Sequence, residues 1–312
     1  MTTGRILILG AAGRIGRAAA ETFRDSGWHV ASLVRGASAD RAAPGTQIVE
    51  VDARDSESVT EAADGMDVIL HALNPPYTDW PAMVPMLAEA AIAAARASGA
   101  TVVLPGNVYN YGAAMPDVLD EGTPMRPSSR KGELRVALET RLREAGTPTI
   151  VIRAGDFYGG PGAGSWFDRV ITRYIEHDRL TYPGPLDVIH EWAYLPDLAA
   201  ALVRLVEARS QFGQFETFGF PGHAVTGAEF TDAIKRALRR EIKVSGMPWW
   251  LLRALGPLIP TFRELTEMSY LWHVPHRIDG SKLKTAIGAV PHTPFETAIA
   301  SALDDLGLLK RG

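Results

Sequence analysis

The chain has 312 residues, 46% of them hydrophobic and 8% aromatic, a composition typical of a globular protein with a substantial core. Its formal net charge is −4 with basic and acidic residues interspersed, which argues against a surface for nucleic acid or for an anionic membrane. Cysteine is absent, so disulfides, thiolate nucleophiles and cysteine-ligated metals are excluded, and we predict no metal site.

The sequence shows no targeting or membrane-spanning segment. Met1 to Gly4 lead directly into an apolar run and do not resemble a signal peptide. The most apolar stretch, Met247 to Pro260, is too short to cross a bilayer and contains Arg253 and Pro257. We interpret it as a buried helix or one that lines a pocket. We therefore expect a cytoplasmic protein whose partner is a small-molecule substrate.

The first half of the chain alternates short aliphatic runs with helical patterns. Strands are predicted at Arg5–Leu9, His29–Val34, Gln47–Val51, Val68–His71, Thr101–Leu104 and Thr149–Ile152, and helices at Ile15–Ser26, Ser56–Ala63, Trp80–Ala97 and Gly132–Ala145. The strands are apolar along their length, as in parallel strands that are covered on both faces. The pattern predicts an α/β fold, a doubly wound parallel (Rossmann) sheet with ligands at the carboxyl ends of the strands.

The second half has a looser pattern. After about Gly155 come short strands and helices with many Pro, Gly and Trp residues. We predict a dinucleotide-binding domain at 1–155, with parts of 185–210 packing back onto it, and a smaller lobe at 156–312 that mainly binds substrate.

Three glycines, Gly10, Gly13 and Gly16, follow the first predicted strand, with Arg14 and Ile15 between the last two. A backbone that approaches a pyrophosphate at a helix N-terminus leaves no room for Cβ atoms. Because a strand precedes the glycines and an Ala-rich helix follows, we interpret the segment as a dinucleotide-binding turn. A strand-to-helix turn without a ligand is the alternative.

Further motifs follow the later strands. They include Asp52 after the third, His71-Ala72-Leu73 after the fourth, Tyr109-Asn110-Tyr111-Gly112 after the fifth, Arg153 to Gly159 after the sixth, and Trp192 to Ala199. With the glycines, these motifs resemble an extended short-chain dehydrogenase/reductase of the NAD-dependent epimerase/dehydratase type over nearly the whole chain. The resemblance implies that Asp52 contacts adenine, that Ala72 and Leu73 run beside the cofactor phosphates, and that helices 80–97 and 132–145 can pair in a homodimer.

The end of the second strand favours NADP(H) over NAD(H). An NAD-binding member would place an acidic residue there to accept the ribose hydroxyls, whereas this chain has Val34 followed by Arg35. A guanidinium can take a 2′-phosphate with two parallel hydrogen bonds, and Arg14 can add a second cation. The alternative is that both arginines are solvated surface charges.

The catalytic pair of the family, Tyr-x-x-x-Lys, is absent. Alignment on Pro127 and Glu139 places Lys131 at the tyrosine position and Arg135 at the lysine position. We hypothesise that Lys131 is a general acid whose pKa is lowered by Arg135, which also binds the nicotinamide ribose. The alternative is that both cations are solvated, or hold phosphate and ribose without chemistry.

Other residues complete the predicted site. Gly106 and Asn107 occupy the place of the family's Ser or Thr, so that Asn107 can orient a carbonyl, and Tyr109 or Tyr111 can supply a phenol. The substrate-binding candidates are Asn74, Tyr109, Asp156 and Trp192, of which Asp156 follows a strand directly.

The sequence therefore predicts an NADP(H)-dependent oxidoreductase that acts on a carbonyl or alcohol of a small, fairly apolar molecule. Two alternatives remain: a nucleotide-sugar epimerase or dehydratase that retains its cofactor, and a non-catalytic NADP(H)-binding sensor or regulator.

Overall fold

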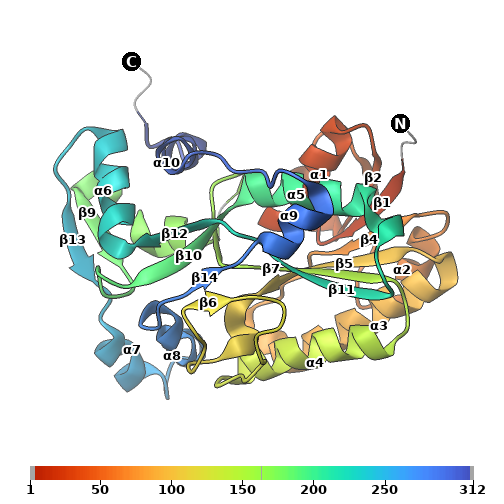
Figure 1. The fold of residues 1–312 in the computed structure, drawn as a ribbon, viewed down its shortest axis with the longest axis horizontal. Helices are drawn as coiled ribbons and strands as arrows, with labels where there is room; N and C mark the ends of the chain where they lie inside the picture. Colours follow the sequence, from red (N-terminus) through yellow and green to blue (C-terminus); the bar gives the residue numbers. More distant parts are fainter. Residues whose placement is uncertain (1–3, 163, 310–312) are drawn as a thin grey trace.

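The computed structural model describes residues 4–162 and 164–309, so that Met1 to Thr3, where we predicted no signal peptide, lie outside the described part. The larger lobe is built on a seven-stranded parallel sheet with the order β11-β7-β5-β4-β1-β2-β3 (Figure 1). Its strands are β1 (Arg5–Leu9), β2 (His29–Val34), β3 (Gln47–Glu50), β4 (Val68–His71), β5 (Thr101–Asn107), β7 (Thr149–Ala154) and β11 (Phe215–Gly219). The predicted doubly wound α/β fold is confirmed.

Helices cover both faces of this sheet (Figure 1). One face packs against α1 (Arg14–Asp25), α5 (Leu195–Glu207) and α9 (Ser281–Ile287), and the other against α2 (Ser56–Ala62), α3 (Trp80–Ser98) and α4 (Arg130–Glu144). Side chains of a strand alternate between the faces, so Ile6 and Ile8 enter the first core and Leu7 and Leu9 the second. Both cores consist of buried apolar side chains, which explains the unbroken apolar runs of the sequence.

The large lobe includes segments that follow residue 155. Strand β11, which the sequence pattern did not reveal, adds to the sheet beside β7, far beyond residue 155. Helix α5 packs on α1, and α9 packs on α5. The large lobe thus takes up segments as late as residue 287. β11 escaped prediction because it is an edge strand, Phe215-Glu216-Thr217-Phe218-Gly219, without a continuous apolar run.

The smaller lobe has its own core. A three-stranded sheet joins β8 (Asp156–Tyr158), β10 (Ile189–Tyr194) and β12 (His223–Thr226), and β9 (Arg179–Tyr182) pairs with β13 (Lys243–Gly246). Helices α6 (Gly227–Leu238) and α10 (Phe295–Asp305) pack together beside them. The core between these elements is rich in aromatic residues, among them Tyr158, Phe167, Tyr182, Trp192, Phe230 and Trp272.

Short elements connect the lobes and border the site. Strand β6 (Val118–Leu119) pairs with β14 (Arg277–Ile278), and α7 (Trp249–Leu255) precedes α8 (Pro260–Glu267). The single-turn elements are η1 (Gly36–Arg41), η2 (Tyr77–Asp79), η3 (Val108–Tyr111), the π-helical η4 (Phe167–Ile171), η5 (Ile175–His177), η6 (Arg209–Gln211) and η7 (Ser269–Trp272).

The apolar stretch Met247 to Pro260 is only partly buried. Trp249 and Leu252 pack into the smaller lobe, whereas Trp250 is 72% and Leu258 79% exposed. The expectation of a buried helix is therefore wrong for the outer side of this stretch, because a seven-residue helix on the edge of a small lobe has only one face in the core. Within 4–162 and 164–309, no helix has the length and apolarity to cross a bilayer.

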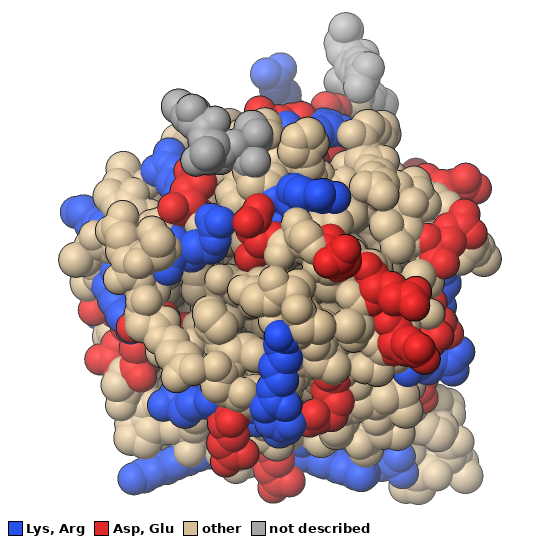
Figure 2. Space-filling view, turned by 90° about the vertical axis from the view of Figure 1, so that its right-hand side faces the viewer, with Lys and Arg blue, Asp and Glu red and all other residues tan. Residues whose placement is uncertain are grey.

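Charged side chains are interspersed on the face in Figure 2, with acidic and basic groups scattered over uncharged surface. This distribution matches the mixed charge pattern of the sequence.

Candidate active site

The glycine turn lies between β1 and α1. Gly10 has a φ of 85°, and a Cβ there would lie 3.0 Å from the carbonyl oxygen of Ala72. A Cβ on Gly16 would overlap the carbonyl oxygen of Gly10. Gly13 caps α1 without a side-chain hydrogen bond, so no side chain occupies the N–H groups of the first turn. These features form a cradle that fits a phosphate.

Arg35 follows β2 directly and is exposed. Across from it, Arg54 Nη2 donates to Asp52 Oδ2 at 2.5 Å. Hydrogen bonds from Arg54, reinforced by the charge of Arg35, lower the pKa of Asp52 to about 2. The acidic residue at this edge of the sheet is therefore Asp52, which follows β3 and is bound to Arg54. The residue that follows β2 is the cation Arg35.

Arg14 lies differently from our expectation. Its guanidinium donates to the carbonyl oxygens of Gly159 at 2.7 Å and Gly162 at 2.9 Å, and forms an ion pair with Asp168 at 3.1 Å. These partners belong to the smaller lobe, so Arg14 links the lobes across the cradle. Both terminal nitrogens are thus used within the protein, and the role of Arg14 as a second cation for a 2′-phosphate stays a prediction.

Helix α4 begins tightly against η3. The Oγ of Ser129 accepts the Gly132 N–H at 3.1 Å and caps the helix. A Cβ on Gly132 would lie 2.5 Å from the carbonyl oxygen of Tyr109. Only glycine therefore allows this approach, which carries Lys131 and Arg135, four residues apart, to the carboxyl ends of β4 and β5.

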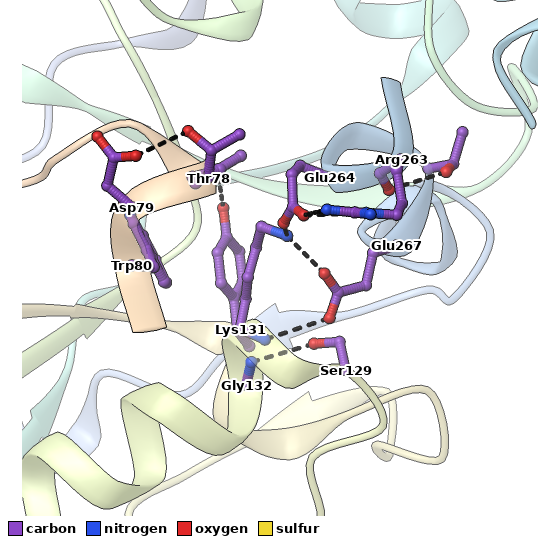
Figure 3. A network of polar contacts seen from close by, with 12 residues as sticks. Thr78, Asp79, Trp80, Ser129, Lys131, Gly132, Arg263, Glu264 and Glu267 are labelled. Carbon is purple, nitrogen blue, oxygen red and sulfur yellow. Dashed lines mark hydrogen bonds and ion pairs between the residues drawn. The ribbon is translucent and has the colours of Figure 1, made fainter. Parts of the chain in front are cut away.

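Lys131 is 1% exposed and lies between two carboxylates of α8 (Figure 3). Its Nζ donates to Glu264, and to Glu267 Oε2 at 2.5 Å. Although burial acts in the opposite direction, the bond from Lys131 lowers the pKa of Glu264. Two carboxylates stabilise the charged ammonium. The hypothesis that Lys131 is a general acid beside Arg135 included no carboxylate next to the ammonium, whereas the fold provides two.

Arg135 is buried with few polar contacts. Its guanidinium carbon lies 4.6 Å from the ring centre of Trp80, and Nη2 reaches Asn74 Oδ1 at 3.5 Å. Its Nε has no hydrogen-bond partner among the described residues, and neither ring nitrogen of the buried His71 has one. Burial, and then the charge of Arg135, lower the pKa of His71 to about 4. Unpaired buried nitrogens of His71, at the end of β4, and of Arg135, on α4, fit a polar ligand.

Two tyrosines stand beside these cations. The hydroxyl oxygens of Tyr77, from η2, and Tyr109, from η3, lie 3.1 Å apart. Asn107 Oδ1 accepts the Tyr109 N–H at 3.1 Å and so caps η3. Burial raises the pKa of both phenols, and the negative charge of Asp156 acts in the same direction. Both tyrosines are therefore protonated at neutral pH.

The smaller lobe contributes Asp156 to the same region. His190 Nε2 donates to Asp156 Oδ2 at 2.9 Å, and the His190 ring stacks on Trp272 with 4.3 Å between ring centres. The carboxylate is therefore held by its own lobe while its charge acts on the tyrosine pair of the other. Among the described residues, no three His, Asp or Glu side chains are grouped so that they could hold a metal ion.

Two predicted site residues serve elsewhere. The Tyr111 hydroxyl accepts from Arg153 Nη1 at 2.9 Å, and Arg153 is paired with the buried Glu139 at 2.6 Å. Tyr111 thus belongs to a structural network and not to the group around Lys131. Trp192 is fully buried and stacks on Phe230 with 4.4 Å between ring centres, so it belongs to the aromatic core of the smaller lobe, and its contact with substrate stays a prediction.

Sequence reasoning missed Tyr77, Glu264 and Glu267. Tyr77 follows two prolines in a loop that carries no motif. Glu264 and Glu267 lie more than 130 residues from Lys131 along the chain, although their spacing of three does place them on one face of a helix. That spacing was the only available signal.

Comparisons with known proteins give the family of the chain. The sequence pattern of the NAD dependent epimerase/dehydratase family matches residues 6–218, more than half of the chain. The chain belongs to this family. Its sequence is 28% identical over 225 residues to a 3-diazoavenalumate denitrifying reductase of Streptomyces, a match that covers 66% of this chain and 73% of the reductase.

Solved structures of similar fold cover nearly the whole chain. MoeE5 in complex with UDP-glucose and NAD has a TM-score of 0.78 at 17% identity, over 97% of this chain and 99% of MoeE5. The Bordetella bronchiseptica enzyme WbmH in complex with NAD⁺ has a TM-score of 0.76 at 19% identity, over 98% of each chain. Membership of the epimerase/dehydratase family makes a nicotinamide dinucleotide the cofactor class of this protein.

Proposed function

We propose that this member of the epimerase/dehydratase family is an NADP(H)-dependent oxidoreductase that acts on a carbonyl or alcohol carbon of a small molecule. One observation carries the proposal: the segments that follow β1, β4 and β5 bring three features to the same edge of the sheet. They are the glycine turn that fits a phosphate, the unpaired buried nitrogen of Arg135, and the paired hydroxyls of Tyr77 and Tyr109. Ligands gather at this edge in doubly wound folds.

The residues of the large lobe fit the dinucleotide. Gly10, Gly13 and Gly16 would hold the pyrophosphate at the start of α1, with Ile15 in its first turn, and Ala72 and Leu73 pack against Gly10. We propose that Asp52 contacts adenine and that Arg35 takes the 2′-phosphate. A carboxylate in place of Arg35 would repel that phosphate, which is why we favour NADP(H).

Arg135 would hold the nicotinamide ribose, since its buried Nε has no partner among the described residues. The nicotinamide supplies or accepts a hydride when bound. The protein supplies the other groups of the reaction. Asn74, Asn107 and Asp156 would border the reacting carbon, and a protonated phenol would donate to the reacting oxygen. Lys131 fixes positive charge beside that phenol.

The relative from Streptomyces supports reduction of an external substrate, because its name is that of a reductase. A nucleotide-sugar epimerase is the alternative that the fold allows. It would recycle its cofactor and need cations for a second pyrophosphate. A sensor would bind NADP(H) without turnover.

A pair of measurements tests the proposal. Purified protein is titrated with NADPH and with NADH, and NADPH oxidation is followed with a panel of ketones, aldehydes and an aryl diazo compound. We expect tighter binding of NADPH and its consumption with at least one member of the panel. Tighter NADH binding would overturn the cofactor preference. Turnover of a UDP-sugar without net cofactor consumption would favour the epimerase, and binding without turnover of either kind would favour the sensor.

A further inference from the structure

We propose that Tyr77 is the proton donor of this enzyme, in place of the tyrosine that the family carries on α4. The proposal rests on the proposed function, because it assigns the acid of that same reaction. The family joins its tyrosine and lysine on one helix turn. In this chain the lysine occupies the tyrosine position, and the tyrosine arrives from the loop after β4.

Tyr77 is held firmly at the carboxyl edge of the sheet. Its ring packs edge-on against Trp80, with 5.1 Å between ring centres at an angle of 85°. The Trp80 indole Nε1 donates to the carbonyl oxygen of Pro75 at 3.0 Å, which fixes the turn on either side of Tyr77. The phenol is thus presented by a rigid, half-buried turn, as proton transfer at a defined distance demands.

Lys131 is placed to stabilise the ionised phenol. Its Nζ lies 5.0 Å from the ring centre of Tyr77. Glu264 and Glu267 both accept hydrogen bonds from the ammonium and so hold it in place (Figure 3). A cation over the ring of a phenol lowers the cost of its ionisation, whereas the charge of Glu267 acts in the opposite direction. The lysine of the family's Tyr-x-x-x-Lys pair likewise favours the ionised form of its tyrosine.

The neighbouring candidates are less well placed. Lys131 is 1% exposed and both carboxylates of α8 engage its ammonium, so it has no free path to a substrate oxygen. Tyr109 is buried behind Tyr77, with its hydroxyl turned toward that of Tyr77. Tyr109 is therefore a positioning residue that can donate to the Tyr77 phenolate. The hydroxyl of Tyr111 is used by Arg153.

With a carbonyl substrate, a proton and a hydride are added across the C=O bond. Tyr77 gives its phenolic proton to the carbonyl oxygen while the carbonyl carbon takes the hydride. The C=O π bond is replaced by one C–H and one O–H bond, the substrate is reduced, and NADPH is oxidised to NADP⁺. Tyr77 is left as a phenolate, with the Tyr109 hydroxyl 3.1 Å away to donate to it, and regains its proton from solvent.

The charged and titratable groups around the Tyr77 hydroxyl set its pH response. They are Tyr109, Arg135, Asp156 and Glu267, with Lys131 over the ring. Burial raises the pKa of the Tyr77 phenol, so activity should fall at alkaline pH, when the donor loses its proton.

The test compares Tyr77→Phe with Tyr174→Phe, which makes the same change at an exposed tyrosine in the smaller lobe. We expect Tyr77→Phe to lower kcat about 100-fold or more, the usual contribution of a positioned acid. The Kd for NADPH, measured by fluorescence titration, should stay unchanged, and so should the far-ultraviolet circular dichroism. Tyr174→Phe should match the wild type in every measurement. The alkaline fall in kcat should disappear from the residual activity of Tyr77→Phe.

The outcomes separate this proposal from the function on which it rests. A wild-type enzyme that consumes NADPH while Tyr77→Phe retains full kcat overturns the role of Tyr77 and leaves the proposed function standing. If Tyr77→Phe raises the Kd for NADPH and leaves kcat unchanged, the role of Tyr77 as proton donor is overturned as well, because the residue would then serve cofactor binding. A wild-type enzyme that reduces no member of the panel overturns the proposed function, and this proposal falls with it.

Discussion

The ammonium of Lys131 and the Oε2 of Glu267 lie 2.5 Å apart, and this contact joins the first turn of α4 to the last turn of α8. The two residues are separated by 136 positions in the chain. Their contact holds the charge of Lys131, which we predict to occupy the family's tyrosine position, and it anchors a short helix over the site. Several measurable properties depend on it.

Replacement of the lysine should destabilise the protein. In Lys131→Met the carboxylates of Glu264 and Glu267 face each other without their cation. We expect a loss of roughly 2 kcal/mol in the free energy of unfolding at pH 7, less than for a fully buried pair because both carboxylates are partly exposed. The double variant Lys131→Met with Glu267→Gln should recover part of this loss. Urea denaturation measures both, and equal stability of the three proteins would contradict the structural role of the contact.

The same pair should make stability depend on acid. The pKa of Glu264 is lowered in the folded protein, so its contribution is present above the ordinary value of 4.5 and is lost as pH falls below it. The difference in stability between wild type and Lys131→Met should therefore shrink as pH falls from 7 toward 3. A difference that is constant with pH would show that the ion pair is not its source.

Glu191 should produce the opposite trend. Burial raises its pKa to about 7, although the backbone N–H groups of Ile278 and Gly222 act against this. Between pH 4.5 and about 7 the unfolded chain loses this proton while the folded chain keeps it, so stability should decline as pH rises through this window. We expect a contribution of roughly 1–3 kcal/mol. Glu191→Gln should flatten the decline, as thermal melts across this pH range would show.

Arg35 should decide the choice of cofactor. Arg35→Gln removes the guanidinium at the end of β2, and we expect the Kd for NADPH to rise roughly tenfold or more, with little change for NADH. Arg179→Gln, at an exposed position of β9, is the control and should change neither Kd. If Arg35→Gln raised the Kd for NADPH and for NADH equally, Arg35 would not distinguish the two cofactors by their 2′-phosphate.

Gly16 should tolerate no side chain. In Gly16→Ala the new methyl group overlaps the carbonyl oxygen of Gly10, and we expect a loss of about 2 kcal/mol or more in stability together with weaker NADPH binding. Gly246→Ala is a matched control, since a Cβ at Gly246 meets nothing within 4 Å. Its stability should stay within about 0.5 kcal/mol of the wild type. Wild-type stability in Gly16→Ala would mean that the turn can relax.

The sequence by itself determined the large lobe and its turn. Unbroken apolar runs such as Val68 to Leu70 predict strands covered on both faces, and the glycines at 10, 13 and 16 predict the cradle, because these features depend on neighbours along the chain. Local pattern also located Lys131 and Arg135 on one face of a helix. The edge strand β11 lacked such a pattern and was missed.

Only the tertiary structure decided what these residues contact. Tyr77 meets Tyr109 from the next loop, Lys131 meets α8, and Arg14 turns to the smaller lobe. Each partner lies tens or more residues away, and no periodicity in the sequence encodes such a distance. The charge and protonation of a side chain depend on its burial and on nearby charges. For this reason the sequence could place a lysine at the tyrosine position of the family, while the fold alone set that lysine beside another tyrosine.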